Sequence, residues 1–137
     1  RAQEVADEIK KSVNSDKVEV ELLDLASLKS VHEFAKNYLA KDRPLHILIN
    51  NAGVAGCPLS YTEDGFEMHI GTNHFGHFAL TLDLLPSLEQ GFKQTGRKSK
   101  IINVSSLAHC LSEIDFDDIN YKSRPYVVRS KSILFHF

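Results

Sequence analysis

Residues 45–53 read LHILINNAG, a short and almost uninterrupted apolar run that ends in two asparagines, an alanine and a glycine. The run Leu45–Ile49 is typical of a strand that is covered on both faces, as in a parallel sheet. Two further apolar runs, Val18–Leu23 and Ile101–Val104, are followed in the same way by short polar side chains. We therefore predict three strands, each followed by polar residues, with Leu45–Ile49 and Ile101–Val104 buried.

Amphipathic segments separate the predicted strands, with apolar residues at the three- and four-residue spacing of a helix. Pro86 and Gly91 are expected to end the longest of them, and the polar stretch Gln90–Lys100 is expected to be a turn. The predicted helices are Arg1–Val13, a segment that opens at Ser27 in the N-cap position and ends before Arg43-Pro44, about Phe66–Leu85, and a last helical start at Val127–Phe137. This alternation predicts an α/β layered domain built from parallel βαβ units.

Composition and charge exclude several classes of protein. The chain has 137 residues, of which 42% are hydrophobic and 25% charged, and its formal net charge is −2. No basic excess favours nucleic acid, and no apolar run approaches the ~18 residues that span a bilayer. The two cysteines, Cys57 and Cys110, are too few for a disulfide framework. Because the chain begins at Arg1 without Met, we expect it to be a piece of a longer protein.

Short polar side chains follow each predicted strand, at the point where open parallel sheets bind their ligands. They are Asp24, the pair Asn50-Asn51 and the pair Ser105-Ser106. Small residues there let a flat ligand approach the backbone, and Asp and Asn supply acceptors and donors for an adenine or a ribose. Taken singly, Asp24 and Ser106 can equally cap the segments that follow, and Asn51 can support a turn. Three such positions at one edge of a sheet favour a binding site.

Four short motifs succeed one another along the chain: NNAG at 50–53, an asparagine in a long helix at Asn73, NVSS at 103–106, and Tyr126 followed by Ser130-Lys131. The ordered set resembles the short-chain dehydrogenase/reductase family. Residues 64–67 (DGFE) together with 73–78 (NHFGHF) are similar to its retinol-dehydrogenase-like branch, which includes the WW-domain oxidoreductase and its relatives.

The resemblance implies part of a doubly wound parallel-sheet Rossmann fold with three α/β/α layers. Residues 1–137 are then the central portion of a single NAD(P)-binding Rossmann-like domain, without the first βαβ unit and the C-terminal part. In the strand order 3-2-1-4-5-6 the chain supplies strands three, four and five, so Leu45–Ile49 and Ile101–Val104 are expected to pair. Val18–Leu23 is expected to lie ~14 Å from them, three steps of ~4.8 Å away.

The resemblance also implies an activity. The expected function is an oxidoreductase that transfers hydride between the nicotinamide of NADP or NAD and a lipophilic alcohol or carbonyl, such as a retinoid, steroid or polyprenol. The alternative is a truncated, non-catalytic isoform or pseudoenzyme that acts through protein contacts. Binding of NAD(P) to the chain distinguishes these two interpretations.

Roles for single residues follow from matching the family motifs. Ser106 would hydrogen-bond the substrate oxygen, and Tyr126 would be the general acid/base. Because a free tyrosine has a pKa of ~10, the cation of Lys131 would be needed beside it. Asn73 would hold a water that links this lysine to solvent. The residues expected at the cofactor are Asp24 and Leu25 at the adenine, Asn51, Ala52 and Gly53 along the adenosine, and Val104, Tyr126 and Lys131 nearer the nicotinamide.

One spacing departs from the family pattern, because Tyr126 and Lys131 are five residues apart rather than four. A four-residue step returns within ~40° of the same helical face, whereas a five-residue step lands ~140° away, and Val127 occupies the strict position. Either Tyr126 precedes the helix and still swings in, or the pair is damaged. In the first case its hydroxyl should come within roughly 3–5 Å of Ser106 Oγ, since both must touch one substrate oxygen.

The expected partner is a small lipophilic substrate, without nucleic acid and without a metal. Three histidines, His69, His74 and His77, lack a carboxylate that would complete a ligand set. Membrane association through segments outside the chain and a homo-oligomer stay open. The expected location is cytoplasmic, or associated with the endoplasmic reticulum and facing the cytosol.

Overall fold

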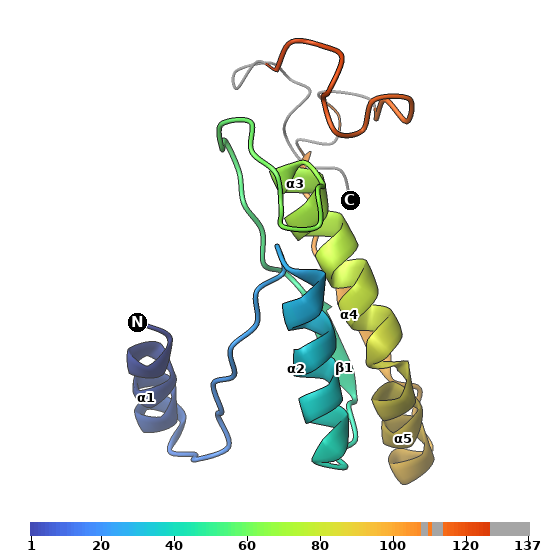
Figure 1. Cartoon of the computed structure of the whole chain (residues 1–137). Coiled ribbons are helices and arrows are strands. Elements are labelled where there is room, and N and C mark those ends of the chain that lie inside the picture. Colours follow the sequence, from blue (N-terminus) through green and yellow to red (C-terminus); the bar gives the residue numbers. More distant parts are fainter. Residues whose placement is uncertain (108–109, 111–113, 127–137) are drawn as a thin grey trace.

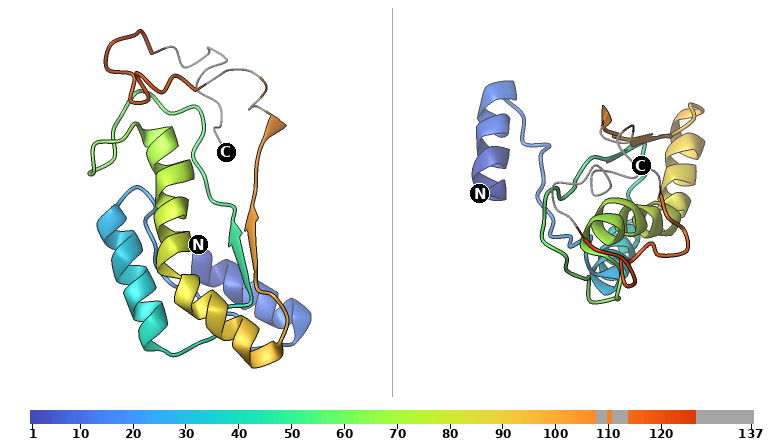
Figure 2. Two further views of the ribbon diagram at one scale, coloured as in Figure 1. Left: turned by 90° about the vertical axis from the view of Figure 1, so that its right-hand side faces the viewer. Right: turned by 90° about the horizontal axis from the view of Figure 1, so that it is seen from above.

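The computed structural model describes residues 1–107, 110 and 114–126 (Figure 1). Helices α2 and α4 lie side by side on one face of a pair of parallel strands (Figures 1 and 2). The elements in chain order are α1 (Ala2–Val13), α2 (Leu28–Ala40), β1 (Ile47–Asn50), α3 (Met68–Ile70), the π-helix η1 (Gly71–Gly76), α4 (His77–Asp83), α5 (Leu85–Thr95) and β2 (Lys100–Asn103). The last predicted helix, Val127–Phe137, lies outside the described residues.

The two strands confirm the α/β fold and the predicted neighbours. β1 and β2 pair in parallel, with Asn50 opposite Asn103. Helices α3 to α5 form the long connection that a parallel pair requires. Backbone hydrogen bonds continue beyond the strand, since the amide of Val104 donates to the Asn50 carbonyl at 3.0 Å. The carboxyl ends of both strands therefore lie together.

The predicted strand Val18–Leu23 is wrong, because these residues belong to no ladder and run as irregular chain between α1 and α2. Leu22 is 92% exposed. A strand forms only where a neighbour satisfies its backbone groups, and in the described part of the chain the sheet holds only β1 and β2. The strand order predicted that this segment would not pair with β1, and in the structure β1 pairs with β2 instead. Figure 2 shows α1 standing apart from the packed helices.

The core lies between α2, α4 and the sheet. Ser27 is the N-cap of α2, and its Oγ accepts a hydrogen bond from the Ser30 amide at 3.1 Å, which confirms the predicted helix start. The buried apolar cluster consists of Leu25, Val31, Ala35, Leu80 and Leu84. Its packing fixes the N-terminal end of α4 beside the carboxyl ends of the strands (Figure 1).

A membrane-spanning helix needs more length and more apolar residues than any helix has in the described part of the chain.

The predicted helix Phe66–Leu85 is divided and ends at Asp83, close to its predicted end, but Pro86 and Gly91 do not terminate it. It runs as α3, η1 and α4, and α5 follows over much of the stretch expected to be a turn. Pro86 lies in the first turn of α5, where its missing N–H needs no partner. Gly91 is buried where a Cβ would come within 2.2 Å of the Leu45 carbonyl oxygen, so it marks close packing. Helix α5 ends at Gly96, whose φ is 69°.

Candidate functional site

The asparagine that ends β1 joins three elements. Asn50 is 4% exposed, and its Nδ2 donates to Thr81 Oγ1 at 3.0 Å and to Asn103 Oδ1 at 2.8 Å. Thr81 lies on α4 and Asn103 on β2, so this side chain ties both strands to the helix that covers them. Within the described residues, its buried Oδ1 has no hydrogen-bond partner. Asn50 therefore serves the architecture at this edge of the sheet.

The loop that follows β1 is held by the helix above it. Asn51, Ala52 and Gly53 are exposed, whereas Asn73 in η1 is 2% exposed. The Asn73 Oδ1 accepts from the Val54 amide at 2.8 Å, and its Nδ2 donates to the Val54 carbonyl at 3.0 Å. The structure thus brings Asn73 to the end of the loop that the sequence predicted to bind a cofactor.

Asp24 and Leu25 lie at the entrance to α2. Asp24 Oδ1 accepts from the Ala26 amide at 2.9 Å, so this carboxylate supports a turn, whereas the cap of α2, the alternative considered for Asp24, is Ser27. Leu25 is 9% exposed and rests on η1, where a Cβ on Gly76 would come within 2.3 Å of the Leu25 carbonyl oxygen. Only glycine permits this approach, which places the Asp24 turn beside the helix that carries Asn73.

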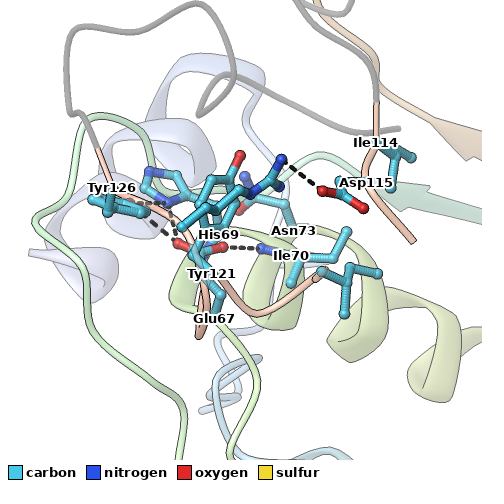
Figure 3. Close-up of a pocket in the computed structure, with 10 residues that line it drawn as sticks. Glu67, His69, Ile70, Asn73, Ile114, Asp115, Tyr121 and Tyr126 are labelled. Atoms are coloured by element: carbon cyan, nitrogen blue, oxygen red, sulfur yellow. Dashed lines mark hydrogen bonds and ion pairs between the residues drawn. The ribbon is translucent and has the colours of Figure 1, made fainter. Parts of the chain in front are cut away.

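A buried acid and an imidazole pair at the start of α3 (Figure 3). Glu67 is 3% exposed and caps this helix, since its Oε2 accepts from the amides of His69 at 2.9 Å and Ile70 at 3.0 Å. Its Oε1 lies 2.7 Å from His69 Nδ1. The Cys57 amide donates to His69 Nε2 at 3.3 Å. Because Nε2 accepts, the proton of a neutral His69 lies on Nδ1 and points to Glu67.

Tyr126 reaches into this same pocket (Figure 3). Its hydroxyl lies 3.1 Å from the Cys57 carbonyl oxygen, 3.2 Å from Glu67 Oε1 and 3.2 Å from His69 Nδ1. Burial, together with the negative charge of Glu67, raises the pKa of Tyr126 well above its usual value. This direction is the opposite of what a base working near neutral pH needs.

The segment 114–126 carries Tyr126 and is fixed by Arg124. The Arg124 guanidinium lies 4.0 Å above the ring of Tyr121, and its Nη1 is 3.1 Å from Asp115 Oδ2. Tyr121 in turn meets the ring of Tyr126 edge-on, at 5.3 Å between centroids. Together with Ile114 and Ile119, these side chains line the pocket over Glu67 and His69. The wall of the pocket is therefore both aromatic and charged.

Comparison with known proteins now identifies the family. Residues 1–115 match the model of the short-chain dehydrogenase family. The chain belongs to this family. The matched range includes the Asp24 turn, the NNAG motif, Asn73 and Ser106.

The chain is similar to retinol dehydrogenases, which confirms the predicted branch of the short-chain dehydrogenase family. It is 51% identical to human retinol dehydrogenase 11 over 84% of this chain and 35% of that protein. Identity to human retinol dehydrogenase 13 is 54%, over 76% of this chain and 30% of that protein. Identity to mouse polyprenol dehydrogenase is 43%, over 98% of this chain and 40% of that protein. The chain thus spans about a third of the length of the curated relatives it matches.

Solved structures confirm the Rossmann-type fold of the family. An uncharacterised protein from Mycobacterium paratuberculosis superposes with a TM-score of 0.69 and 40% identity, over 89% of this chain and 41% of that one. The complex of Pseudomonas aeruginosa RhlG with NADP in its active site gives a TM-score of 0.61 and 27% identity, over 83% and 44%.

Some of the site residues expected from the family are brought together and others are not. Asn73 bonds to the backbone of Val54, directly after the NNAG motif. Val104 and Ser106 come shortly after the end of β2 in the sequence. The hydroxyl of Tyr126 bonds to Cys57, Glu67 and His69, a set that does not include Ser106. Lys131 lies outside the described residues. The approach of Tyr126 to Ser106, and the effect of the five-residue spacing, stay predictions.

Glu67 and His69 are the residues that sequence reasoning missed. The acidic residue directly before a helix is a recognisable cap signal, because helix N-termini favour negative charge. His69 was weighed only as a metal ligand. In the described residues, no three His, Cys, Asp or Glu side chains gather into a set that could hold a metal ion. The pairing with Tyr126 depends on residues more than fifty positions apart, which no local pattern reveals.

Proposed function

We propose that the protein containing this chain is an NAD(P)-dependent oxidoreductase that transfers hydride between a nicotinamide and a lipophilic alcohol or carbonyl. The observation that carries the proposal is the edge of the sheet where β1 and β2 end. There a small-residue loop, 51–53, is exposed and anchored on Asn73 beside the Asp24 turn. Membership of the short-chain dehydrogenase family, and the NADP complex of RhlG among the structural neighbours, support it.

The residues at this edge fit a dinucleotide. Asn51, Ala52 and Gly53 present little side-chain bulk, so a flat ligand can lie against the backbone. Asp24 and Leu25 would contact the adenine, and Val104, Tyr126 and Lys131 would lie toward the nicotinamide. Either NADP or NAD suits this set. When bound, the nicotinamide supplies or accepts the hydride.

Protein side chains would transfer the proton to or from the substrate oxygen. Ser106 would donate a hydrogen bond to the substrate oxygen, and Tyr126 would give or take the proton at that oxygen. Lys131 would stabilise the phenolate of Tyr126, and Asn73 would hold a connecting water. For this step the Tyr126 hydroxyl has to leave Glu67 and Cys57, its partners in the structure, and bond to the substrate instead.

The proposed substrates are lipophilic, of the retinoid, steroid or polyprenol kind. The names of the relatives support this class, since retinol and polyprenol dehydrogenases are among them. A location in the cytoplasm, or at the endoplasmic reticulum facing the cytosol, is proposed on the same resemblance. Association with a membrane and a homo-oligomer stay predictions.

Equilibrium titration of the chain with NADP and with NAD tests the cofactor. Micromolar affinity is expected, and it would exclude a purely non-catalytic role. No detectable binding would overturn activity for the chain as given. In the whole protein, Tyr126→Phe should abolish turnover of retinol and leave cofactor binding nearly intact. The same change at Tyr38, on α2, removes a phenol far from the site and should leave turnover unchanged.

A further inference from the structure

The loop after β1 has no room to move relative to Asn73. A Cβ on Gly53 would lie 3.1 Å from Asn73 Oδ1, so the loop backbone rests directly on this side chain. Both ends of the Asn73 amide are already bonded to the backbone of Val54. Because Asn73 is 2% exposed, water cannot readily replace those bonds. The position of Gly53 and Val54 therefore depends on the position of Asn73.

Asn73 is in turn held by a side chain one turn further along. The carbonyl of Asn73 lies 2.8 Å from Nδ1 of His77, which is 6% exposed. A carbonyl oxygen only accepts, so Nδ1 carries the proton and donates it. In a regular α-helix the backbone amide of His77 would donate to this carbonyl. Here that amide donates to the carbonyl of His74, because the π-helix ends at this point.

The imidazole of His77 thus adds a side-chain donor to the Asn73 carbonyl at the junction of η1 and α4. We propose that His77 is a positioning residue of the cofactor site, which acts through Asn73 on the loop of Gly53 and Val54. The role rests on the proposed function, in which this loop lines the adenosine. The hydrogen bonds to the loop are made by Asn73, and His77 bonds to the Asn73 carbonyl.

Two substitutions separate positioning from packing. In His77→Asn, the side-chain Nδ2 stands where Nδ1 of the imidazole stood, so it can still donate to the Asn73 carbonyl. In His77→Leu the volume is largely kept but the donor is lost. His46→Leu is the matched control, because His46 is an exposed histidine directly before β1, at the opposite end of that strand from the loop. All variants are made in the complete chain.

The first measurement needs no cofactor. In His77→Leu the amide of Val54 should exchange its hydrogen about tenfold faster, the effect of about one lost hydrogen bond. The amide of Val104, which bonds to the Asn50 carbonyl just beyond the β1–β2 ladder, should keep its rate, and His77→Asn and His46→Leu should resemble the parent. An unchanged Val54 rate in His77→Leu overturns the proposal. Equal acceleration at Val54 and Val104 also overturns it, since it indicates general loosening.

The second measurement is the affinity for NADP or NAD. His77→Leu should weaken binding by about tenfold, and His77→Asn should restore most of it. If the parent binds neither cofactor, the proposed function fails for this chain, and the exchange data alone decide the role of His77. Should His77→Leu not fold, nitrogen NMR of the parent decides: a proton on Nδ1 supports the proposal, and one on Nε2 alone overturns it.

Discussion

The hydroxyl of Tyr126 lies 3.2 Å from Oε1 of Glu67, a carboxylate that is 3% exposed. A negative charge so close favours the neutral phenol over the phenolate. The structure therefore favours a neutral Tyr126 that is bonded to Glu67, Cys57 and His69, whereas the proposed chemistry needs its hydroxyl at a substrate oxygen. In the proposed reaction the Tyr126 hydroxyl therefore has to give up its hydrogen bond to Glu67 and form one to the substrate.

Replacing Glu67 by Gln should lower the pKa of Tyr126. Burial raises this pKa first, and the Glu67 charge and hydrogen bond raise it further, so removing the charge removes part of the shift. The near-ultraviolet absorbance of the phenolate during alkaline titration measures the change, with Tyr126→Phe identifying the signal. Glu89→Gln makes the same substitution on the exposed side of α5 and should leave the curve unchanged. Coincident curves for the parent and Glu67→Gln would contradict the assignment.

Glu67 should also make the protein sensitive to acid. Burial alone would raise the pKa of Glu67, but hydrogen bonds from the His69 ring and from the Ile70 and His69 amides lower it below the usual 4.5. The unfolded chain then binds a proton at a higher pH than the native one. The stabilisation that Glu67 provides is fully present above the pKa that Glu67 has in the unfolded chain. It is lost as the pH falls through the lower pKa of Glu67 in the folded protein.

Urea unfolding at a series of pH values tests this expectation. The free energy of unfolding should fall more steeply in the parent than in Glu67→Gln as the pH drops from about 6 to about 3. Parallel pH profiles for the two proteins would show that the carboxylate is not stabilised in the native state.

The two neighbouring asparagines at the end of β1 should respond differently to mutation. Asn50→Ala removes buried bonds to Thr81 and Asn103 and should cost about 1–3 kcal/mol of stability. Asn51 is exposed, so Asn51→Ala should change stability by less than about 0.5 kcal/mol. It should nevertheless weaken NADP or NAD binding, because Asn51 belongs to the proposed cofactor surface. Urea unfolding and cofactor titration of both variants check this; equal stability losses would refute it.

Gly76→Ala should destabilise the protein strongly. The new Cβ would lie 2.3 Å from the Leu25 carbonyl oxygen, and moving a helix off a backbone segment costs about 1–3 kcal/mol or more. Gly65→Ala is the comparison, since no atom lies within 4 Å there and only its φ of 85° opposes a side chain. That cost is about 1–2 kcal/mol. A thermal unfolding series ranks the two, and a smaller loss at Gly76 would contradict the close approach.

Local patterns were sufficient for the parts of the fold that local forces decide. The apolar runs at 45–49 and 101–104 gave the parallel pair, and the cap at Ser27 gave the start of α2. Val18–Leu23 alternates apolar residues with Glu19 and Glu21, as a strand can, but it lacks a neighbouring strand in the described residues. Its structure depends on partners that its own residues do not encode.

The positions of site residues could be predicted from the sequence where a motif lies on one element. They could not be predicted where several loops come together. The NNAG loop and Asn73 lie at the same end of the sheet, as the motifs indicated. The surroundings of Tyr126 depend on three segments, at Cys57, at Glu67 and at 114–126, that meet only after folding. Hydrophobic periodicity carries no signal for such a meeting.

The π-helical turn at Gly71–Gly76 sets the rotational phase between the two ends of one helix. It takes in one residue more than an α-helical path, so side chains before it are turned by about 100° relative to a continuous helix. Glu67 and His69 consequently face the segment that carries Tyr126, while Leu80 and Leu84 face α2. Deleting one residue from this turn would make the helix regular and would rotate the acid–imidazole pair out of its pocket, while Leu80 and Leu84, which follow the turn, would keep their place against α2.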